Sequence, residues 1–129
     1  MIIVPPHSQI GVDVPDEWWE FCGMSDWRPQ SLLYPYKPSN DQQVDVVNIS
    51  DIEPPQRDPG VAPFKKYKLV PVLLAFQSPE CALPPVCIAD STNGAGRHLL
   101  LNGFHRYYAS VAVGYTQIPV VVLPSPHDA

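Results

Sequence analysis

The stretch that decides the fold is residues 99–122, which reads LLLNGFHRYYASVAVGYTQIPVVV. It begins as an apolar strand and reaches Gly103, which lets the backbone make a tight turn into a helix. The helix is predicted over residues 104–113 and ends at Gly114, a natural left-handed C-cap. A second apolar strand follows over 119–123. The pattern therefore predicts a strand, a glycine turn, a short helix and a returning strand.

The first turn of this predicted helix carries an unusual set of side chains. Phe104, His105 and Arg106 lie where backbone N–H groups have no partner within the helix. A cation near a helix start opposes the positive end of the helix dipole, so Arg106 adds nothing to helix stability there. A free helix start with an arginine and a histidine is typical of an anion site, above all for phosphate.

Three blocks of the chain carry a resemblance. VNISDIEPPQR at 47–57, PPVCI at 84–88 and LNGFHRYYAS at 101–110 occur in the order found in the ParB/sulfiredoxin superfamily. The resemblance covers residues 44–123. It implies an α/β (α+β) domain, with a small mixed β-sheet and a few packed helices. In that family a G-x-H-R or G-E-R-R box opens a helix and binds nucleotide phosphates.

The resemblance also implies the site. It indicates ATP or another nucleotide with Mg as cofactor, and a nucleotide or phosphorylated small molecule as partner. Glu53 is the candidate general base, because some relatives are small-molecule kinases with a carboxylate near the first strand. The implied phosphate- and nucleotide-binding residues are Arg57, Gly103, Phe104, His105 and Arg106.

The chain departs from two branches of the family. Sulfiredoxins have a cysteine immediately before the His-Arg pair, where this chain has Phe104, so sulfinic-acid reduction is excluded. Partitioning ParB proteins have two adjacent arginines and a helix-turn-helix domain downstream. Here the box reads His105-Arg106 and the sequence ends at Ala129, which argues against centromere binding.

Each candidate residue also has a structural interpretation. Arg106 can form a salt bridge with Asp51, Glu53 or Asp58. His105 can donate to a phosphate or can be a buried histidine bonded to a backbone carbonyl. Glu53 can be a solvated turn residue.

The functional hypothesis is a domain that binds a nucleotide or phosphorylated ligand at a helix N-terminus, with phosphotransfer or hydrolysis as a further activity. One alternative is a protein-interaction module with a vestigial phosphate site. The other is a metal-dependent nuclease, which requires carboxylates gathered around a metal. The candidates for that role are Asp51, Glu53, Asp58 and Asp90.

Composition and charge narrow the functional classes to which the protein can belong. The net charge is −5 with only 8 Lys and Arg in 129 residues, which argues against non-specific nucleic-acid binding. The 3 cysteines form no C-x-x-C pair, so we expect reduced thiols and neither a disulfide scaffold nor a zinc site. The start MIIVPP lacks a basic region and no apolar run reaches the ~20 residues of a membrane span, so we expect a cytoplasmic protein with no membrane partner.

Residues 1–43 form an aromatic, proline-rich N-terminal arm, and 44–129 form the predicted domain. Within the arm, DEWWEF at 16–21 is predicted as one or two helical turns, with its acids at the positive helix end. We expect the arm's aromatic rings to pack on the core, of the same chain or of a partner in a homodimer. The rings are Trp18, Trp19, Phe21, Trp27, Tyr34 and Tyr36.

The remaining elements follow from pattern. Strands are predicted over 44–49, 85–90 and 97–101, with a hairpin loop at 93–96. Leu69, Val72, Leu73 and Phe76 have helical spacing and predict a helix over 67–77. An interior proline costs about 3 kcal/mol, so Pro71 is tolerated if that helix begins near Lys68, which would place Pro71 in its first turn. In the helix over 104–113, the residues expected to face the core are Tyr108, Val111 and Ala112.

Overall fold

The computed structural model describes residues 2–6, 12–13, 16–25, 45–54, 66–77 and 85–123. Its centre is a five-stranded mixed sheet in the order β3-β7-β5-β6-β4, which confirms the predicted mixed α+β class. β3 and β6 run antiparallel to their neighbours β7 and β5, whereas the pairs β5–β7 and β4–β6 are parallel. The strands are β3 (Asp45–Asn48), β4 (Ile52–Glu53), β5 (Val86–Thr92), β6 (His98–Asn102) and β7 (Gln117–Leu123).

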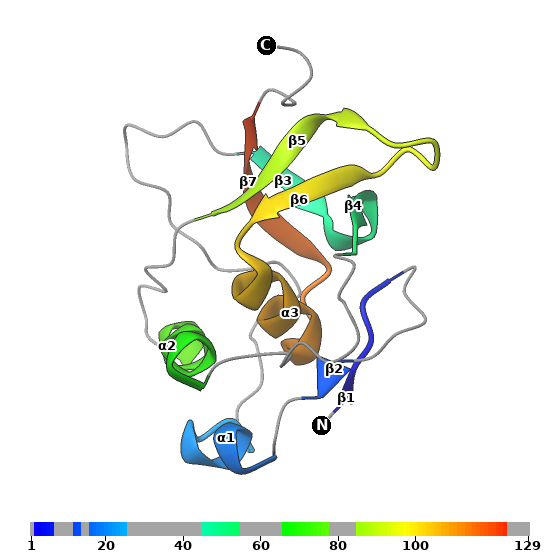
Figure 1. Ribbon diagram of the computed structural model, residues 1–129. Helices are drawn as coiled ribbons and strands as arrows, with labels where there is room; N and C mark the ends of the chain where they lie inside the picture. The colour runs from blue at the N-terminus through cyan, green and yellow to red at the C-terminus, as the bar shows by residue number, and fades with distance from the viewer. Residues whose placement is uncertain are drawn as a thin grey trace.

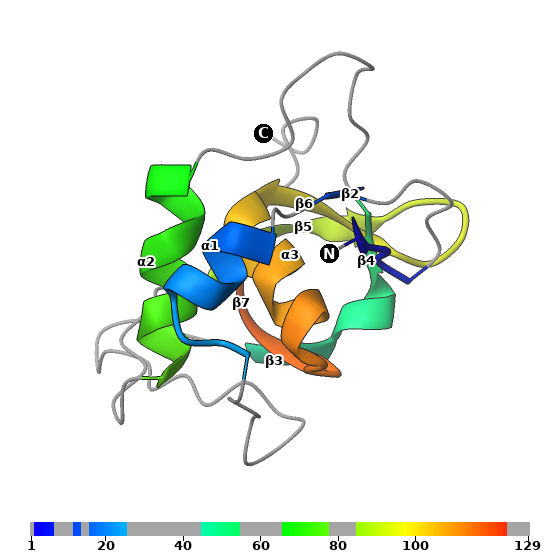
Figure 2. The same ribbon diagram turned by 90° about the horizontal axis from the view of Figure 1, so that it is seen from below.

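The described helices lie on one side of this sheet, with α3 (Phe104–Val113) nearest to it (Figures 1 and 2). α2 (Lys66–Gln77) packs beside α3, and α1 (Asp16–Phe21) lies farther from the sheet. A short 3-10 helix, η1 (Ile49–Asp51), links β3 to β4, and β1 (Ile2–Ile3) pairs with β2 (Val12–Asp13) in a separate two-stranded sheet. None of the helices described is long and apolar enough to cross a membrane.

Glycines at both ends set the bounds of α3, as predicted. Gly103 has φ +95° and Gly114 has φ +94°. Both values lie in the left-handed region, which residues other than glycine rarely adopt. At the C-terminal end, the Gly114 amide donates to the carbonyls of Ser110 and Val111, and the Tyr115 amide donates to Ser110 at 3.1 Å. These bonds satisfy the last carbonyls of the helix.

The core fills the space between α2, α3 and the sheet. Tyr108 is buried as expected, and Val111 and Ala112 pack against the core. In α2 the predicted apolar face is also confirmed, because its members are all buried. They are Leu69, Val72, Leu73 and Phe76.

α2 begins within one residue of the predicted start at 67, but Pro71 does not lie in its first turn. The helix begins at Lys66, so Pro71 is its sixth residue and lies in the helix interior, beyond the first turn. Pro71 is exposed, so its ring does not disturb the buried face. Fully burying one large apolar side chain stabilises by about 1.5–3 kcal/mol, and four such residues outweigh a proline penalty of about 3 kcal/mol.

The hairpin between β5 and β6 forms at the predicted residues. The Asn93 amide donates to Arg97 O at 2.8 Å, and the Gly96 amide donates to Asn93 O at 2.9 Å. Gly96 has φ +76°, which a glycine adopts at little cost.

The described part of the N-terminal segment packs on the core. Met24 is fully buried, Cys22 is nearly so, and Trp18 and Trp19 are half-buried against the same cluster. Phe21 is 69% exposed, contrary to the expectation that the arm's rings are covered. Trp27, Tyr34 and Tyr36 lie outside the described residues, and the division at 43/44 stays a prediction.

Gln77, the last residue of α2, ties the end of α1 to that helix. Its Nε2 donates to Cys22 O at 2.5 Å and lies 3.2 Å from Met24 Sδ. Cys22 and Cys87 are free thiols, and Cys81 lies outside the described residues.

Substitution of Met24 tests this packing. Met24→Ala removes a fully buried side chain and leaves a cavity, so we expect the free energy of unfolding to fall by about 2–5 kcal/mol. The matched control Phe21→Ala removes an exposed ring and should change it by less than about 0.5 kcal/mol. Urea unfolding of both variants is the measurement, and equal losses would contradict the account.

Candidate functional site

Gly103 sits where the chain leaves β6 and enters α3, and its surroundings leave no room for a side chain. A Cβ built there would lie 2.7 Å from Val86 Cγ1 and 3.1 Å from Arg106 Nη2. The Gly103 amide donates to Asn102 Oδ1 at 2.8 Å, and its carbonyl accepts from the Tyr107 amide at 2.9 Å. Two features of the turn therefore require glycine at position 103: its positive φ and the close approach of Val86.

The start of α3 is a helix N-terminus without a side-chain cap, because its N-cap residue is Gly103. Phe104, the first helical residue, is 42% exposed, whereas His105 and Arg106 are half-buried. The predicted box residues are thus together in one turn at the C-terminal end of β6. A helix start of this kind presents backbone N–H groups and the positive end of the dipole.

Arg106 folds back over the turn. Its Nη1 donates to Pro85 O at 2.7 Å, and its Nη2 lies beside the position that a Gly103 side chain would occupy. The guanidinium therefore ties the residue before β5 to the first turn of α3. It also places a positive charge at the positive end of the helix, an arrangement that the helix dipole itself does not favour.

Glu53 lies on the edge strand β4, opposite Leu99 of β6. Its Oε2 is 2.6 Å from Arg97 Nε in an ion pair, and it accepts a hydrogen bond from Asn93 Nδ2 at 3.0 Å. The carboxylate is thus bound to the β5–β6 hairpin. The sequence signal that could have found this ion pair is weak, because 44 residues separate Glu53 from Arg97.

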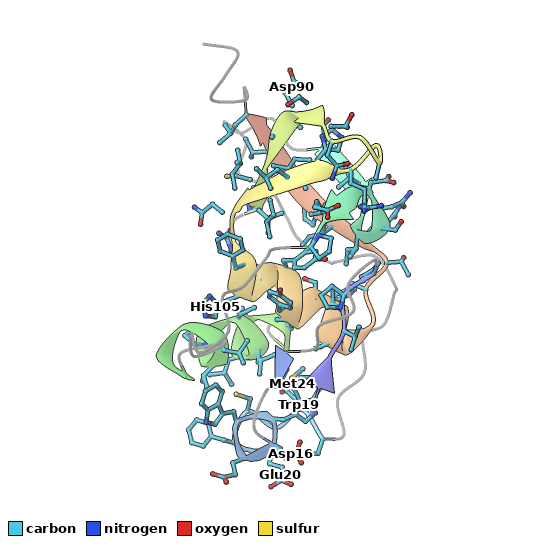
Figure 3. All side chains as sticks on the ribbon, turned by 45° about the vertical axis from the view of Figure 1, so that its right-hand side comes forward. Asp16, Trp19, Glu20, Met24, Asp90 and His105 are labelled. Atoms are coloured by element: carbon cyan, nitrogen blue, oxygen red, sulfur yellow. The ribbon has the colours of Figure 1, made fainter. Side chains whose placement is uncertain are left out.

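The other predicted residues divide between exposed positions and undescribed ones. Asp51 is exposed in η1. Asp90 is exposed on β5 at one end of the molecule, whereas His105 lies near the middle, well away from it (Figure 3). Arg57 and Asp58 lie outside the described residues. Among the side chains described, no group of three or more His, Cys, Asp and Glu could hold a metal ion.

Tyr107 is a further residue that the sequence pattern did not indicate. It is 0% exposed, and its hydroxyl has no hydrogen-bond partner in the described part of the chain. Its ring meets Tyr108 edge-on, with centroids 5.2 Å apart. Burial raises the pKa of the Tyr107 phenol well above its ordinary value of 10.0, and the nearby Tyr108 and Glu53 raise it further. No periodicity distinguishes Tyr107 from Tyr108, so only packing could reveal which hydroxyl is enclosed.

The glycine turn can be tested against a second glycine. Gly103→Ala should lower the free energy of unfolding by at least about 2 kcal/mol, through backbone strain and the clash with Val86. Gly94→Ala is the control, because a Cβ at Gly94 meets nothing within 4 Å. Chemical unfolding should leave the Gly94 variant within about 0.5 kcal/mol of the parent. A tolerated Gly103→Ala would refute the described turn.

Removing the Tyr107 hydroxyl should stabilise the protein. Tyr107→Phe deletes a buried polar group that has no hydrogen-bond partner among the described residues, so we expect the free energy of unfolding to rise by about 1 kcal/mol at pH 7. Above pH 10 the unfolded state loses the phenol proton while the folded state keeps it, so the parent loses stability as the pH rises. The advantage of the variant should therefore grow from pH 9 to 11 in urea unfolding. A destabilised variant would show that the hydroxyl makes a bond.

Comparison with known proteins assigns this chain to no family. No protein-family model, no curated protein and no solved structure matches the chain. The resemblance to the ParB/sulfiredoxin superfamily therefore stays a prediction, based on the three sequence blocks.

Proposed function

We propose that the turn between β6 and α3 binds the phosphate group of a small ligand, with a nucleotide as the preferred class. The observation that carries the proposal is the position of the Arg106 guanidinium over Gly103, at the positive end of α3. Phosphate accepts hydrogen bonds from guanidinium and from backbone N–H groups alike. A phosphate at this point would lie within reach of both kinds of donor.

The exposed ring of Phe104 supports a nucleotide over a bare phosphate. Phe104 is the first residue of α3, and 42% of it is exposed although large apolar side chains are commonly buried. An aromatic face of this kind can stack on a base while the helix start holds the phosphate. Base stacking on an aromatic side chain contributes about 1–3 kcal/mol.

Magnitudes indicate that the helix start is not sufficient alone. The dipole contributes about 0.3–1 kcal/mol, rising to ~2 kcal/mol when partly buried, whereas micromolar affinity requires about 8 kcal/mol. A charge-assisted bond from Arg106 adds about 1.5–3 kcal/mol. The proposal therefore needs a second cation, and Arg57 is the candidate that the resemblance supplies.

The proposal concerns binding, with phosphotransfer as a separate hypothesis. Glu53, the candidate general base, accepts hydrogen bonds from Arg97 and Asn93. An ion pair favours the charged carboxylate and lowers its basicity, which works against proton abstraction. A role for Glu53 in catalysis would require the ion pair with Arg97 to open.

Calorimetric titration with ATP, ADP and inorganic phosphate, each with and without Mg, tests the proposal. Arg106→Gln should weaken nucleotide binding at least about tenfold, because tenfold corresponds to 1.4 kcal/mol. Arg97→Gln is the charge-matched control, since Arg97 belongs to the hairpin, and it should bind as the parent does. Arg106→Lys retains both a cation and a donor for Pro85 O, so it should keep more of the binding than Arg106→Gln does.

Two outcomes would overturn the proposal. Equal weakening by the Arg97 and Arg106 substitutions would indicate a general charge effect. No binding of any phosphate compound by the parent would favour the alternative of an interaction module with a vestigial phosphate site.

A further inference from the structure

Two asparagines in this chain precede a glycine, and the two pairs lie in very different surroundings. Asn93-Gly94 lies in the hairpin between β5 and β6, and Asn102-Gly103 lies at the turn into α3. In an Asn-Gly pair the glycine amide nitrogen can attack the side-chain amide carbon, because no Cβ on the next residue obstructs the approach. The outcome depends on whether that nitrogen is accessible and whether the turn can move.

The Gly94 amide is accessible. Asn93 and Gly94 are both exposed, and the space beside Gly94 holds no atom within 4 Å of a Cβ built there. The hairpin is described in full, and within it no hydrogen bond engages the Gly94 amide. Water and hydroxide can therefore remove its proton, which must leave before the nitrogen attacks.

The Asn93 side chain connects three parts of the molecule. Its Oδ1 accepts from the amides of Ala95 and Arg97, each at 3.0 Å, and its Nδ2 donates to Glu53 Oε2 at 3.0 Å. The orientation of the Asn93 side-chain amide is unambiguous. If the group were flipped, its Nδ2 would face the amide donors of Ala95 and Arg97, and its Oδ1 would face the Glu53 carboxylate. Two N–H bonds on Oδ1 also draw electron density from the carbon that would be attacked.

The Asn102-Gly103 pair is protected by comparison. Gly103 is buried, its amide already donates to Asn102 Oδ1 at 2.8 Å, and Val86 packs against it. Attack there requires the start of α3 to open. Each 1.4 kcal/mol of opening free energy reduces the open population about tenfold.

We propose that Asn93 is a site of spontaneous deamidation, and that the reaction releases Glu53 from the hairpin. The Gly94 nitrogen loses its proton and bonds to Cγ of Asn93, while the bond from Cγ to Nδ2 breaks and ammonia leaves with the proton. Water then opens the resulting succinimide ring at either carbonyl. The products are aspartate or isoaspartate at position 93, and the only co-reactant is water.

The product changes the charges around β4. The donor to Glu53 Oε2 becomes a carboxylate, so two like charges face each other and compete for Arg97. β4 has only two residues, and its pairing with β6 consists of Ile52 opposite His98 and Glu53 opposite Leu99. The fully buried side chain of Ile52 anchors one half of this short edge strand, and the side-chain bonds of Glu53 hold the other half, which deamidation should loosen.

Peptide mapping of the whole protein tests the reaction. Trypsin cleaves after Lys68, Arg97 and Arg106, so Asn93 and Asn102 fall in separate peptides, 69–97 and 98–106. After incubation of the folded protein at pH 8, we expect deamidation at Asn93 to exceed that at Asn102 at least about tenfold. In urea the two sites should react at similar rates. Equal rates in the folded protein, or a faster reaction at Asn102, would overturn the proposal.

Two variants test the deamidation reaction and the release of Glu53 separately. Gly94→Ala adds a Cβ beside the attacking nitrogen and should suppress deamidation at Asn93 without changing the fold. Asn93→Asp imitates the aspartate product and should speed hydrogen exchange at the amides of Ile52 and Glu53 about tenfold. Adding Glu53→Gln to that variant should reverse most of the increase in exchange rate. Unchanged exchange in Asn93→Asp would refute the release of Glu53, and unchanged deamidation in Gly94→Ala would refute the mechanism.

Discussion

The close contact between Gly103 and Val86 is the constraint on which the rest of this structure depends. It joins the end of β6 to the start of α3 and presses that turn against the first residue of β5. Because β5 pairs with both β6 and β7, the turn positions α3 against the centre of the sheet. The same contact places the helix start and Arg106 together, so one backbone conformation determines both the packing and the candidate site.

Much of this region follows from local sequence. Residues 104–113 between two glycines predict α3 correctly, because both ends need a positive φ and the apolar spacing between them has a helical period. The hairpin at Asn93 and the buried face of α2 follow in the same way. Local rules failed at Pro71, where burial of neighbouring side chains outweighed an unfavourable backbone position.

The parts that could not be predicted depend on distant partners. The ion pair of Glu53 with Arg97 exists because β4 adds to the sheet beside β6, and sheet order is not visible in a single strand. The enclosed hydroxyl of Tyr107 and the exposure of Phe21 likewise reflect packing between elements. That the candidate residues on α3 lie together could be predicted because they share one helical turn, whereas Arg57 lies outside the described residues.

The most direct test of the account is an NMR titration of the ¹⁵N-labelled full chain with ATP. If phosphate binds at the start of α3, the amide resonances of Gly103, Phe104, His105 and Arg106 should shift together, with one dissociation constant. The effect should weaken as salt is added, because the interaction is electrostatic. Shifts confined to other parts of the chain, or none at saturating nucleotide, would contradict the central claim that this turn is an anion site.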